Sequence, residues 1–451
     1  MNSQWKSRIG AALLVVGAVF VLGFGQKPEP APPQNKKISD EKSKGEETIY
    51  GNTPEDLKPF AKYVSEPYKK FWVPSDNPVE FWGPGRDKPE PEVDTVKIGI
   101  IAPITRSYET YIGQSVLHGM QMAIDDANAS GGYKGKKFET VLKNDTGLWG
   151  APANEIITLT YDDKVWAVIG TVDGANTHIA IRVALRTEIP IMNVADLDPT
   201  LVETKIPWIV RVIPDDRQMT YTIAYYVYKQ LGLNSVAILR ANNRYGRFGV
   251  TQFRKSSIKL GKPAPIEINY EPNYDKVNPN FDVQMSRLAE VNPDAVVLWA
   301  DAEAAGVLVK KIRERGMKFP IFACERIVHP DFLKAAGPAA EGVVATYPMN
   351  LESRDPKYLE FVKRYEERFQ AKPDCYAVHS YDGTMITVEA IRKAGLNRYR
   401  IMDAMAMTKH WDGISGPIDL DEALSNRRPV TVATVKDGKF VFGLPKMNKT
   451  F

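Results

Sequence analysis

Hydrophobic positions along this chain form short apolar runs separated by longer amphipathic stretches, beginning at Thr95. The first series of β-branched runs is "VKIGIIAP", "KFETVLKND", "VWAVIG" and "IPIMNV". After a break near "RVIPDDRQ", the second series is "SVAILRA", "PIEINY", "DAVVLWA", "FPIFAC" and "EGVVATYP". Short apolar runs that alternate with segments of helical length are typical of parallel strands joined by crossover helices. The pattern therefore predicts an α/β fold with two doubly wound, Rossmann-like sheets.

The stretch 111–136, "YIGQSVLHGMQMAIDDANASGGYKGK", indicates how one of these helices begins and ends. Apolar residues recur there every three or four positions, which predicts a helix with one buried face. These residues are Val116, Met120, Ile124 and Ala127. The polar residues expected on the other face are Gln121, Asp125 and Asp126. Gly131 and Gly132 should end the helix, because glycine readily adopts the positive φ of a sharp turn.

An uncharged apolar segment, "IGAALLVVGAVFVLGFG" at residues 9–25, follows Lys6 and Arg8. Such a segment is typical of a cleavable signal peptide and is also long enough to remain as a membrane anchor. Both alternatives for residues 1–25 export the rest of the chain, either free or tethered to the membrane. The first cysteine is Cys324, so lipid attachment directly after the apolar segment is excluded.

Two further segments precede the first strand. Residues 26–48 are rich in Pro, Lys, Glu and Ser and are expected to form a disordered tether. Residues 49–94 mix prolines with many aromatic residues. We expect them to form a strap packed on the main domain, and a partner-docking segment is the alternative.

Composition and motifs narrow the function. The chain has 451 residues, 43% of them hydrophobic, and a net charge of +4 without a basic stripe, which argues against nucleic-acid binding. The sequence lacks the glycine motifs that bind nucleotides and the G-x-S-x-G motif of hydrolases. It also lacks the metal-binding or redox motifs H-E-x-x-H and C-x-x-C. We therefore expect no enzyme, no metal and no cofactor, and we interpret His178 as a helix-surface residue.

A set of segments, taken in their order and spacing, carries a resemblance to a known family. They are "IGIIAPITRSYETYIGQ", "NASGGYKGK", "VWAVIGTVDGANT", "IPIMNVADLDPTL", "IVRVIPDDRQM", "VAILRANNRYGRFGV", "NPDAVVLWADAEAAG" and "DGISGPIDLDE". From Val96 to about Val441 the chain resembles the Leu/Ile/Val-binding family of type I periplasmic binding proteins, the solute receptors of branched-chain amino acid and amide ABC transporters.

The resemblance implies two lobes joined by three crossover strands, expected near residues 212–215, 346–349 and 413–417. Lobe I is then expected to comprise residues 95–211 and 350–412, and lobe II residues 212–349 and 413–451. Ligand would bind in the cleft between the lobes, which close on it.

The resemblance also implies which residues meet the ligand, at the carboxyl ends of the strands. Tyr111 matches the aromatic residue that covers the ligand from lobe I, and Tyr245 matches the one that closes from lobe II. Glu325 matches the carboxylate that receives the ligand ammonium in amino acid receptors. Tyr376 is a further cleft candidate, although core packing accounts for it equally well.

Other cleft positions depart from the family pattern. The loop after the third strand reads "GTVDGANTH", where Asp173 replaces a small polar residue and Asn176 and Thr177 remain as possible donors. The next loop reads "NVADLDP", which keeps Ala195 but has Asp196 beside it and lacks a Thr hydroxyl. A ligand carboxylate would be repelled by such aspartates.

With Asp301, which stands where the family often has an aromatic residue, four carboxylates can line one cleft. Buried carboxylates need partners, so the cleft favours a cationic or amide-bearing solute, or one bound with a metal ion, over a zwitterionic amino acid. In the alternative, Asp173 caps the following helix and Asp196 lies on a water-facing turn. Arg244 and Arg326 are candidates to neutralise part of the set.

Cys324 and Cys375 are the only cysteines in a chain expected to meet an oxidising compartment. A bond between them would link the two lobes and obstruct opening, so we expect two separate buried thiols.

Two functions follow from the sequence. The first is a solute-binding component that delivers a small molecule to an ABC permease in the inner membrane. The alternative is a membrane-tethered sensor or accessory module that uses the same cleft and signals its occupancy to a partner protein.

Overall fold

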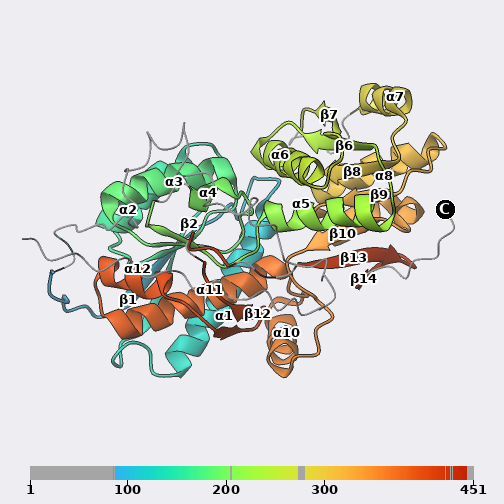
Figure 1. The fold of residues 1–451 in the computed structure, drawn as a ribbon. Helices are drawn as coiled ribbons and strands as arrows, with labels where there is room; N and C mark the ends of the chain where they lie inside the picture. Colours follow the sequence, from blue (N-terminus) through green and yellow to red (C-terminus); the bar gives the residue numbers. More distant parts are fainter. Residues whose placement is uncertain are drawn as a thin grey trace, which may run out of the picture. The chain divides into compact units, whose positions relative to one another are not determined.

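The computed structural model describes residues 85, 87–203, 206–272, 280–421, 423–426, 428 and 430–443, and Figure 1 labels the helices and strands. The segment 1–25 predicted as signal peptide or anchor and the tether predicted at 26–48 lie outside these residues, as does most of the strap predicted at 49–94. Within the described ranges, no helix is long and apolar enough to cross a membrane.

The first sheet has five parallel strands in the order β2-β1-β3-β4-β5. They are β1 (Val96–Ile101), β2 (Phe138–Lys143), β3 (Val168–Gly170), β4 (Ile191–Asn193) and β5 (Ile209–Arg211). The connecting helices are α1 (Thr110–Ala129), α2 (Ala151–Tyr161), α3 (Gly174–Thr187) and the short α4 (Thr200–Glu203). Three later helices join them: α10 (Pro356–Phe369), α11 (Cys375–Ala394) and α12 (Arg398–Ala406). We call this sheet with its helices lobe I, in which α1 and α11 pack against each other below the sheet and α2 and α3 lie above it (Figure 1).

The second sheet has seven strands in the order β14-β13-β10-β9-β8-β6-β7. The parallel strands are β6 (Val236–Ala241), β7 (Ile266–Tyr270), β8 (Ala295–Trp299), β9 (Ile321–Ala323) and β10 (Val344–Tyr347). Two antiparallel strands, β13 (Thr431–Lys436) and β14 (Lys439–Phe442), extend the edge beside β10. We call this sheet with its helices lobe II.

The helices of lobe II are α5 (Asp216–Tyr225), α6 (Arg244–Lys259), α7 (Asp282–Val291), α8 (Ala302–Glu314) and α9 (Pro330–Ala336). Short helical turns are the π-helix η4 (Tyr226–Gln230), η5 (Glu325–Ile327) and η6 (Gly337–Ala340). A hairpin of β11 (Trp411–Gly413) and β12 (Gly416–Ile418) follows α12. The chain passes between the lobes after β5, after β10 and after α12, so the predicted fold of two interleaved α/β lobes with three crossovers is confirmed. The exact lobe boundaries stay a prediction.

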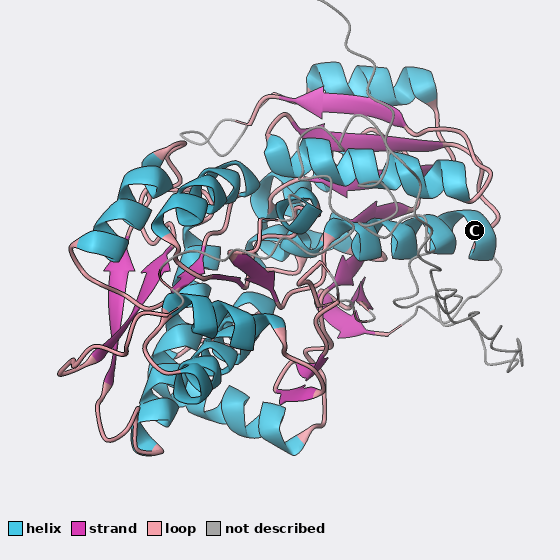
Figure 2. Cartoon of the chain, turned by 60° about the vertical axis from the view of Figure 1, so that its left-hand side comes forward, coloured by secondary structure: helices cyan, strands magenta, loops and turns pink. Residues whose placement is uncertain are grey.

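The central strands β6 and β8 of lobe II bury both faces, which explains their continuous apolar runs. Along β8, Val297 and Trp299 pack on the side of α5 and α6, while Val296 and Leu298 pack on the side of α7, α8 and α9. Figure 2 shows these strands side by side with helices on both sides. A strand in this position cannot place a polar residue on either face without burying it.

Helix α1 confirms the predicted apolar stripe, because Val116, Met120, Ile124 and Ala127 are buried. It ends before Gly131 and Gly132, whose φ angles are 98° and 63°. A Cβ at Gly132 would lie 2.1 Å from the carbonyl oxygen of Lys136, so the turn into β2 excludes any other residue there.

The predicted outward face of α1 is only partly solvated. Arg364 on α10 binds the two carboxylate oxygens of Asp126 at 2.7 and 2.9 Å, and the Tyr381 hydroxyl donates to the same carboxylate. The prediction that Asp126 faces away from the sheet is correct, but α10 and α11 cover it. The Asp126 carboxylate thus links α1 to α10 and α11, two helices that are distant from it in the sequence.

Residues 87–94 pack on lobe I. Glu90 accepts a hydrogen bond from the Tyr133 hydroxyl and pairs with Lys134 at 2.9 Å, both in the turn after α1. Asn397, at the start of α12, donates to the carbonyl of Lys88. The described end of the segment before β1 is therefore fixed at the edge of lobe I.

The two cysteines are free and buried, as the sequence predicted. Cys324 follows β9 in lobe II, and Cys375 opens α11 in lobe I. No disulfide therefore joins the lobes.

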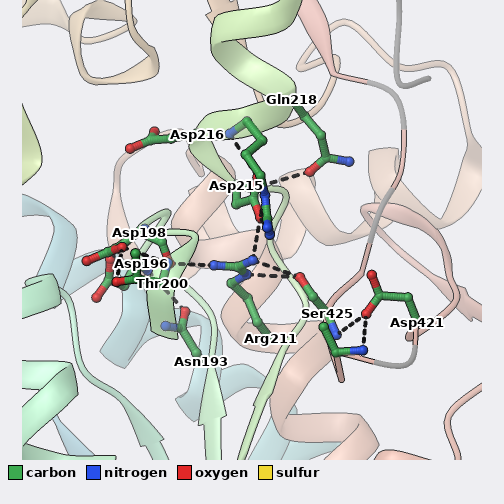
Figure 3. Close-up of polar contacts among 12 residues, drawn as sticks. Asn193, Asp196, Asp198, Thr200, Arg211, Asp215, Asp216, Gln218, Asp421 and Ser425 are labelled. Carbon is green, nitrogen blue, oxygen red and sulfur yellow. Dashed lines mark hydrogen bonds and ion pairs between the residues drawn. The ribbon is translucent and has the colours of Figure 1, made fainter. Parts of the chain in front are cut away.

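A buried arginine fastens the first passage between the lobes (Figure 3). Arg211, at the end of β5, has no exposed surface. Its guanidinium donates to Asp215 Oδ2 at 2.6 Å, to Ser425 Oγ at 2.9 Å and to the Asp198 carbonyl at 2.7 Å. Burial alone would raise the pKa of Asp215, but the charges of Arg217 and Arg211 outweigh it and hold that pKa at about 2. The pair is therefore fully charged at neutral pH.

Replacing Arg211 with alanine is expected to lower the free energy of unfolding by about 3 kcal/mol or more, because Asp215 then stays buried with one of its two cations missing. Urea denaturation followed by tryptophan fluorescence measures this loss. Arg287→Ala is the matched control, because Arg287 pairs with Glu290 on the surface and should contribute less than about 1 kcal/mol. Equal losses in the two variants would contradict the role of Arg211.

Candidate functional site

The loops at the carboxyl ends of the parallel strands carry the charged residues of the candidate site. In lobe I, Glu109 and Tyr111 follow β1, and Asp196 follows β4. In lobe II, Tyr245 lies in the first turn of α6 after β6, and Glu325 follows β9. Parallel strands end at the same edge of their sheet, so residues far apart in the sequence meet where the two lobes face each other.

These loops enclose a small cavity between the lobes. The space open to the centre of a water molecule is about 10 Å³, room for about one water-sized group. Lobe I contributes Gly174, Ala195, Asp196, Leu197 and Asp198, and lobe II contributes Asp216, Arg244, Tyr245, Phe248, Glu325 and Arg326. Four residues predicted to meet the ligand, Ala195, Asp196, Tyr245 and Glu325, are thus brought together. Their role in binding stays a prediction.

Arg326 crosses from lobe II to lobe I beside this cavity. Its guanidinium lies 2.8 Å from Glu109 in lobe I and 2.7 Å from Asp301 in lobe II, and it stacks 3.8 Å above the centre of the Tyr245 ring. Asp301, predicted as a cleft residue, therefore has a cation of its own. The sequence named Arg326 as a candidate to neutralise the cleft, and the structure places it between two carboxylates.

Arg244 makes a second contact between the lobes. Its Nε donates to Asp198 Oδ2 at 2.6 Å, and its terminal nitrogen donates to Thr200 at 3.0 Å. A Cβ at Gly174 would lie 2.8 Å from the same Asp198 oxygen, so the absence of a side chain leaves room for this pair. His178, which the sequence places on a helix surface, lies on α3 with 20% of its side chain exposed and bonds to Thr200 at 2.8 Å.

Three tyrosines surround Glu325. The Tyr245 hydroxyl donates to Oε2 at 2.8 Å, and the Tyr376 hydroxyl, from α11 of lobe I, donates to Oε1 at 3.3 Å. The Tyr111 ring lies 6.4 Å from that of Tyr376 and 4.5 Å from that of His329 in lobe II. The predicted aromatic residues of both lobes thus meet next to the carboxylate assigned to the ligand ammonium.

The polar residues of the loop after β3 are already bonded within lobe I. Asp173 accepts hydrogen bonds from the backbone N–H groups of Ala175 and Asn176, so it caps α3, the alternative that the sequence left open. The Asn176 side chain accepts from the Gly150 N–H and faces the loop before α2. The Thr177 hydroxyl donates to Asp196 Oδ2 at 2.6 Å.

Asp196 does not lie on a water-facing turn, because it is 5% exposed and lines the cavity. Its Oδ1 accepts the backbone N–H of Asp198 at 3.0 Å. The alternative interpretation of this residue as solvated is therefore wrong.

Three cleft carboxylates were missed by the sequence prediction: Glu109, Asp198 and Asp216. Each lies in a loop that directly follows a predicted strand. This position at the end of a strand is the signal by which the sequence could have identified it as a cleft residue. Asp216 opens α5, is 1% exposed, and its Oδ1 has no hydrogen-bond partner. Figure 3 shows its carboxylate pointing away from Arg211 and Asp215.

Burial disfavours charge on Glu109, Asp196 and Asp216. Burial raises the pKa of Glu109 to about 8 despite the Arg326 charge. Burial raises the pKa of Asp196 to about 8, and the neighbouring Asp198 carboxylate adds to this effect. Burial also raises the pKa of Asp216, with Glu325 as the next cause. The cavity therefore carries carboxyl groups that a nearby cation would ionise.

The described residues contain no group of three or more His, Cys, Asp or Glu side chains placed to hold a metal ion. The carboxylates of the cleft contact hydroxyl, guanidinium and backbone N–H donors instead.

Comparisons with known proteins agree with this geometry. A family model described as periplasmic binding protein matches residues 95–439. The leucine-, isoleucine-, valine-, threonine- and alanine-binding protein of Pseudomonas aeruginosa is 22% identical over 305 residues, which are 67% of this chain and 79% of that protein.

Two solved structures share the fold. A leucine-binding protein, LivK, from Thermotoga maritima has a TM-score of 0.71 at 24% identity and covers 78% of this chain and 98% of its own. The branched-chain amino acid transporter substrate-binding protein LivJ from Streptococcus pneumoniae, in complex with isoleucine, has a TM-score of 0.69 at 21% identity, with coverage of 77% and 100%.

The raised pKa of Asp196 predicts a pH-dependent stability. A carboxyl group whose pKa rises from 3.8 to about 8 on folding destabilises the folded state progressively as the pH rises between these values. Asp196→Asn removes this titrating carboxyl group. The free energy of unfolding of the variant minus that of the wild type should therefore increase with pH, by up to about 1.4 kcal/mol per pH unit, and level off above pH 8. Urea denaturation of both proteins between pH 5 and pH 9 measures the difference. A difference that is constant over this range would contradict the prediction.

Proposed function

The chain belongs to the Leu/Ile/Val-binding group of the periplasmic binding protein family, and on this premise we propose that it is the extracytoplasmic solute-binding protein of an ABC-type importer. The solute is small and amino-acid-like, amide-bearing or cationic. It binds between the lobes, which close on it, and is delivered to a permease in the inner membrane.

The observation that carries this proposal is a cavity whose wall comes from both lobes. Asp196 and Leu197 approach it from lobe I, and Tyr245 and Glu325 from lobe II. A ligand in such a cavity touches both lobes only when they are together, so its binding energy favours the closed arrangement. The cross-lobe contacts of Arg244 and Arg326 support the same geometry.

We assign the first contacts of the ligand to Tyr111, Tyr245 and Glu325, with Tyr376 beside them. Tyr245 of lobe II donates to the Glu325 carboxylate, and Tyr111 of lobe I packs near Tyr376, whose hydroxyl donates to the same carboxylate. Asp173 and Asn176 are left out of this assignment, because their side chains are bonded within lobe I.

The relatives named above are solute-binding proteins, which supports a binding role and gives no support to catalysis. Their family implies a location outside the cytoplasm. We propose that residues 9–25 direct this export, as a cleaved signal or as an anchor that keeps the receptor beside its permease.

Replacing Tyr245 or Tyr111 with alanine is expected to weaken solute binding at least tenfold, because each ring covers the ligand with a large aromatic face. A thermal-shift screen of the purified full-length chain against amino acids, amides and amines identifies the solute, since a ligand at a hundred times its Kd stabilises the folded state by about 2.7 kcal/mol. Titration calorimetry then compares the variants.

Tyr161→Ala is the control for this comparison, because Tyr161 is 59% exposed at the end of α2. Wild-type affinity in both cleft variants would contradict this placement of the ligand. The absence of any stabilising solute would favour the accessory module over the receptor.

A further inference from the structure

Three carboxyl groups on the cavity wall, those of Asp196, Asp216 and Glu325, have no cation within hydrogen-bond distance. Asp196 is bonded to the Thr177 hydroxyl and a backbone N–H, and Glu325 to two tyrosine hydroxyls. Asp216 Oδ1 is buried and has no partner at all. A buried carboxylate oxygen without a donor is costly, so this oxygen indicates a missing positive or hydrogen-bond-donating group.

The two arginines of the cavity are already engaged. Arg244 pairs with Asp198, and Arg326 pairs with Glu109 and Asp301. Arg326 Nε lies 3.9 Å from Glu325, which is beyond a hydrogen bond, and has no hydrogen-bond partner. The nearby Glu325 carboxylate repels an anion from that nitrogen, so Arg326 does not make the cavity an anion site.

The lobe I donors that would hold a ligand carboxylate are also engaged. The backbone N–H groups of Ala175 and Asn176 donate to Asp173, and those of Ala195 and Asp196 donate to Asn193. These acceptors belong to the protein itself. A ligand carboxylate in the cavity would therefore find these four backbone donors already bonded, and it would lie next to the carboxylates of Asp196 and Asp198.

The size of the cavity sets a further limit. About 10 Å³ of space between the lobes admits one water-sized group, such as an ammonium, while the rest of a larger ligand must extend toward the cleft opening. An ammonium has three donors in a compact volume, which matches three carboxyl groups that converge on a small space.

Resting on the proposed receptor function, we propose that the cavity binds the ammonium end of a primary amine that has no carboxylate. Asp216 provides the central charge, and Asp196 and Glu325 provide the other two acceptors. The solute class is thus alkyl amines and diamines rather than α-amino acids.

Titration calorimetry of the full-length chain at constant ionic strength tests this inference with n-butylamine, 1,4-diaminobutane, leucine and acetamide as probes. At least one of the amines is expected to bind, with an affinity at least a hundredfold higher than that of leucine or acetamide. Asp216→Asn should weaken amine binding at least tenfold, because it removes the charge and leaves the shape. Asp282→Asn, on the exposed surface of α7, should leave the affinity unchanged.

Thermal unfolding separates a binding defect from a folding defect. Asp216→Asn replaces a buried carboxyl group whose Oδ1 has no donor, so its melting temperature without ligand should equal or exceed that of the wild type. Glu325→Gln provides a second variant and should also weaken amine binding; its amide oxygen still accepts from one tyrosine hydroxyl, and its amide nitrogen can donate to the other.

The outcomes are distinguishable. Tighter binding of leucine or acetamide than of either amine would overturn the amine inference and keep the solute receptor. Undiminished amine binding in both Asp216→Asn and Glu325→Gln would overturn the assignment of the ammonium to these carboxylates. Binding of none of the four probes would overturn the inference, and the wider screen above would then decide the receptor function.

Discussion

The Arg211–Asp215 ion pair is the contact on which the geometry of the cleft depends. Arg211 ends the last strand of lobe I and binds Asp215, the residue before α5 of lobe II. The same guanidinium holds the carbonyl of Asp198, whose side chain lines the cavity. The loop that carries Asp196 and Asp198 is thereby fixed relative to the start of α5, where Asp216 stands. One fully buried cation thus sets the spacing of acids that come from two lobes.

The distribution of charge follows from this arrangement. Carboxylates gather at the strand ends because two sheets present their carboxyl edges to the same space, and each must find a donor or hold a proton. Arg211 pairs with Asp215 and Arg244 pairs with Asp198. Arg326 pairs with both Glu109 and Asp301. The acids left over, Asp196, Asp216 and Glu325, all line the cavity, so the carboxyl groups without a close cation are concentrated where a solute would enter.

The fold could be predicted from the sequence because its signals are local. Runs such as "DAVVLWA" are apolar at every position only if both faces of the strand are covered, and Gly132 marks a turn that tolerates no side chain. The hairpin of β13 and β14 was missed although Asp437 and Gly438 form a typical turn pair between two alternating runs.

The site was predicted less completely, because its contacts join residues far apart in the chain. Local pattern placed Asp173 and Asp196 in strand-end loops but could not tell that one caps a helix while the other lines a cavity. Arg326 pairs with Glu109 of lobe I and Asp301 of lobe II, and both acids are many residues away from it in the sequence. Which acid is neutralised depends on those partners, and no local feature of the sequence specifies them.

In the proposed receptor, closure of the lobes would therefore depend only partly on the ligand. Arg244 and Arg326 already join lobe II to Asp198 and Glu109 of lobe I, so contact between the lobes is stabilised by charges of the protein itself. A ligand can shift the equilibrium only by its difference in affinity between the two states, and a change from 1:99 to 99:1 needs about 5.5 kcal/mol. Since the arginines supply part of the attraction between the lobes, the ligand needs to supply only the remainder. Selectivity then depends on the acids that the arginines leave unpaired, and the fold shared with branched-chain amino acid receptors does not by itself determine the solute.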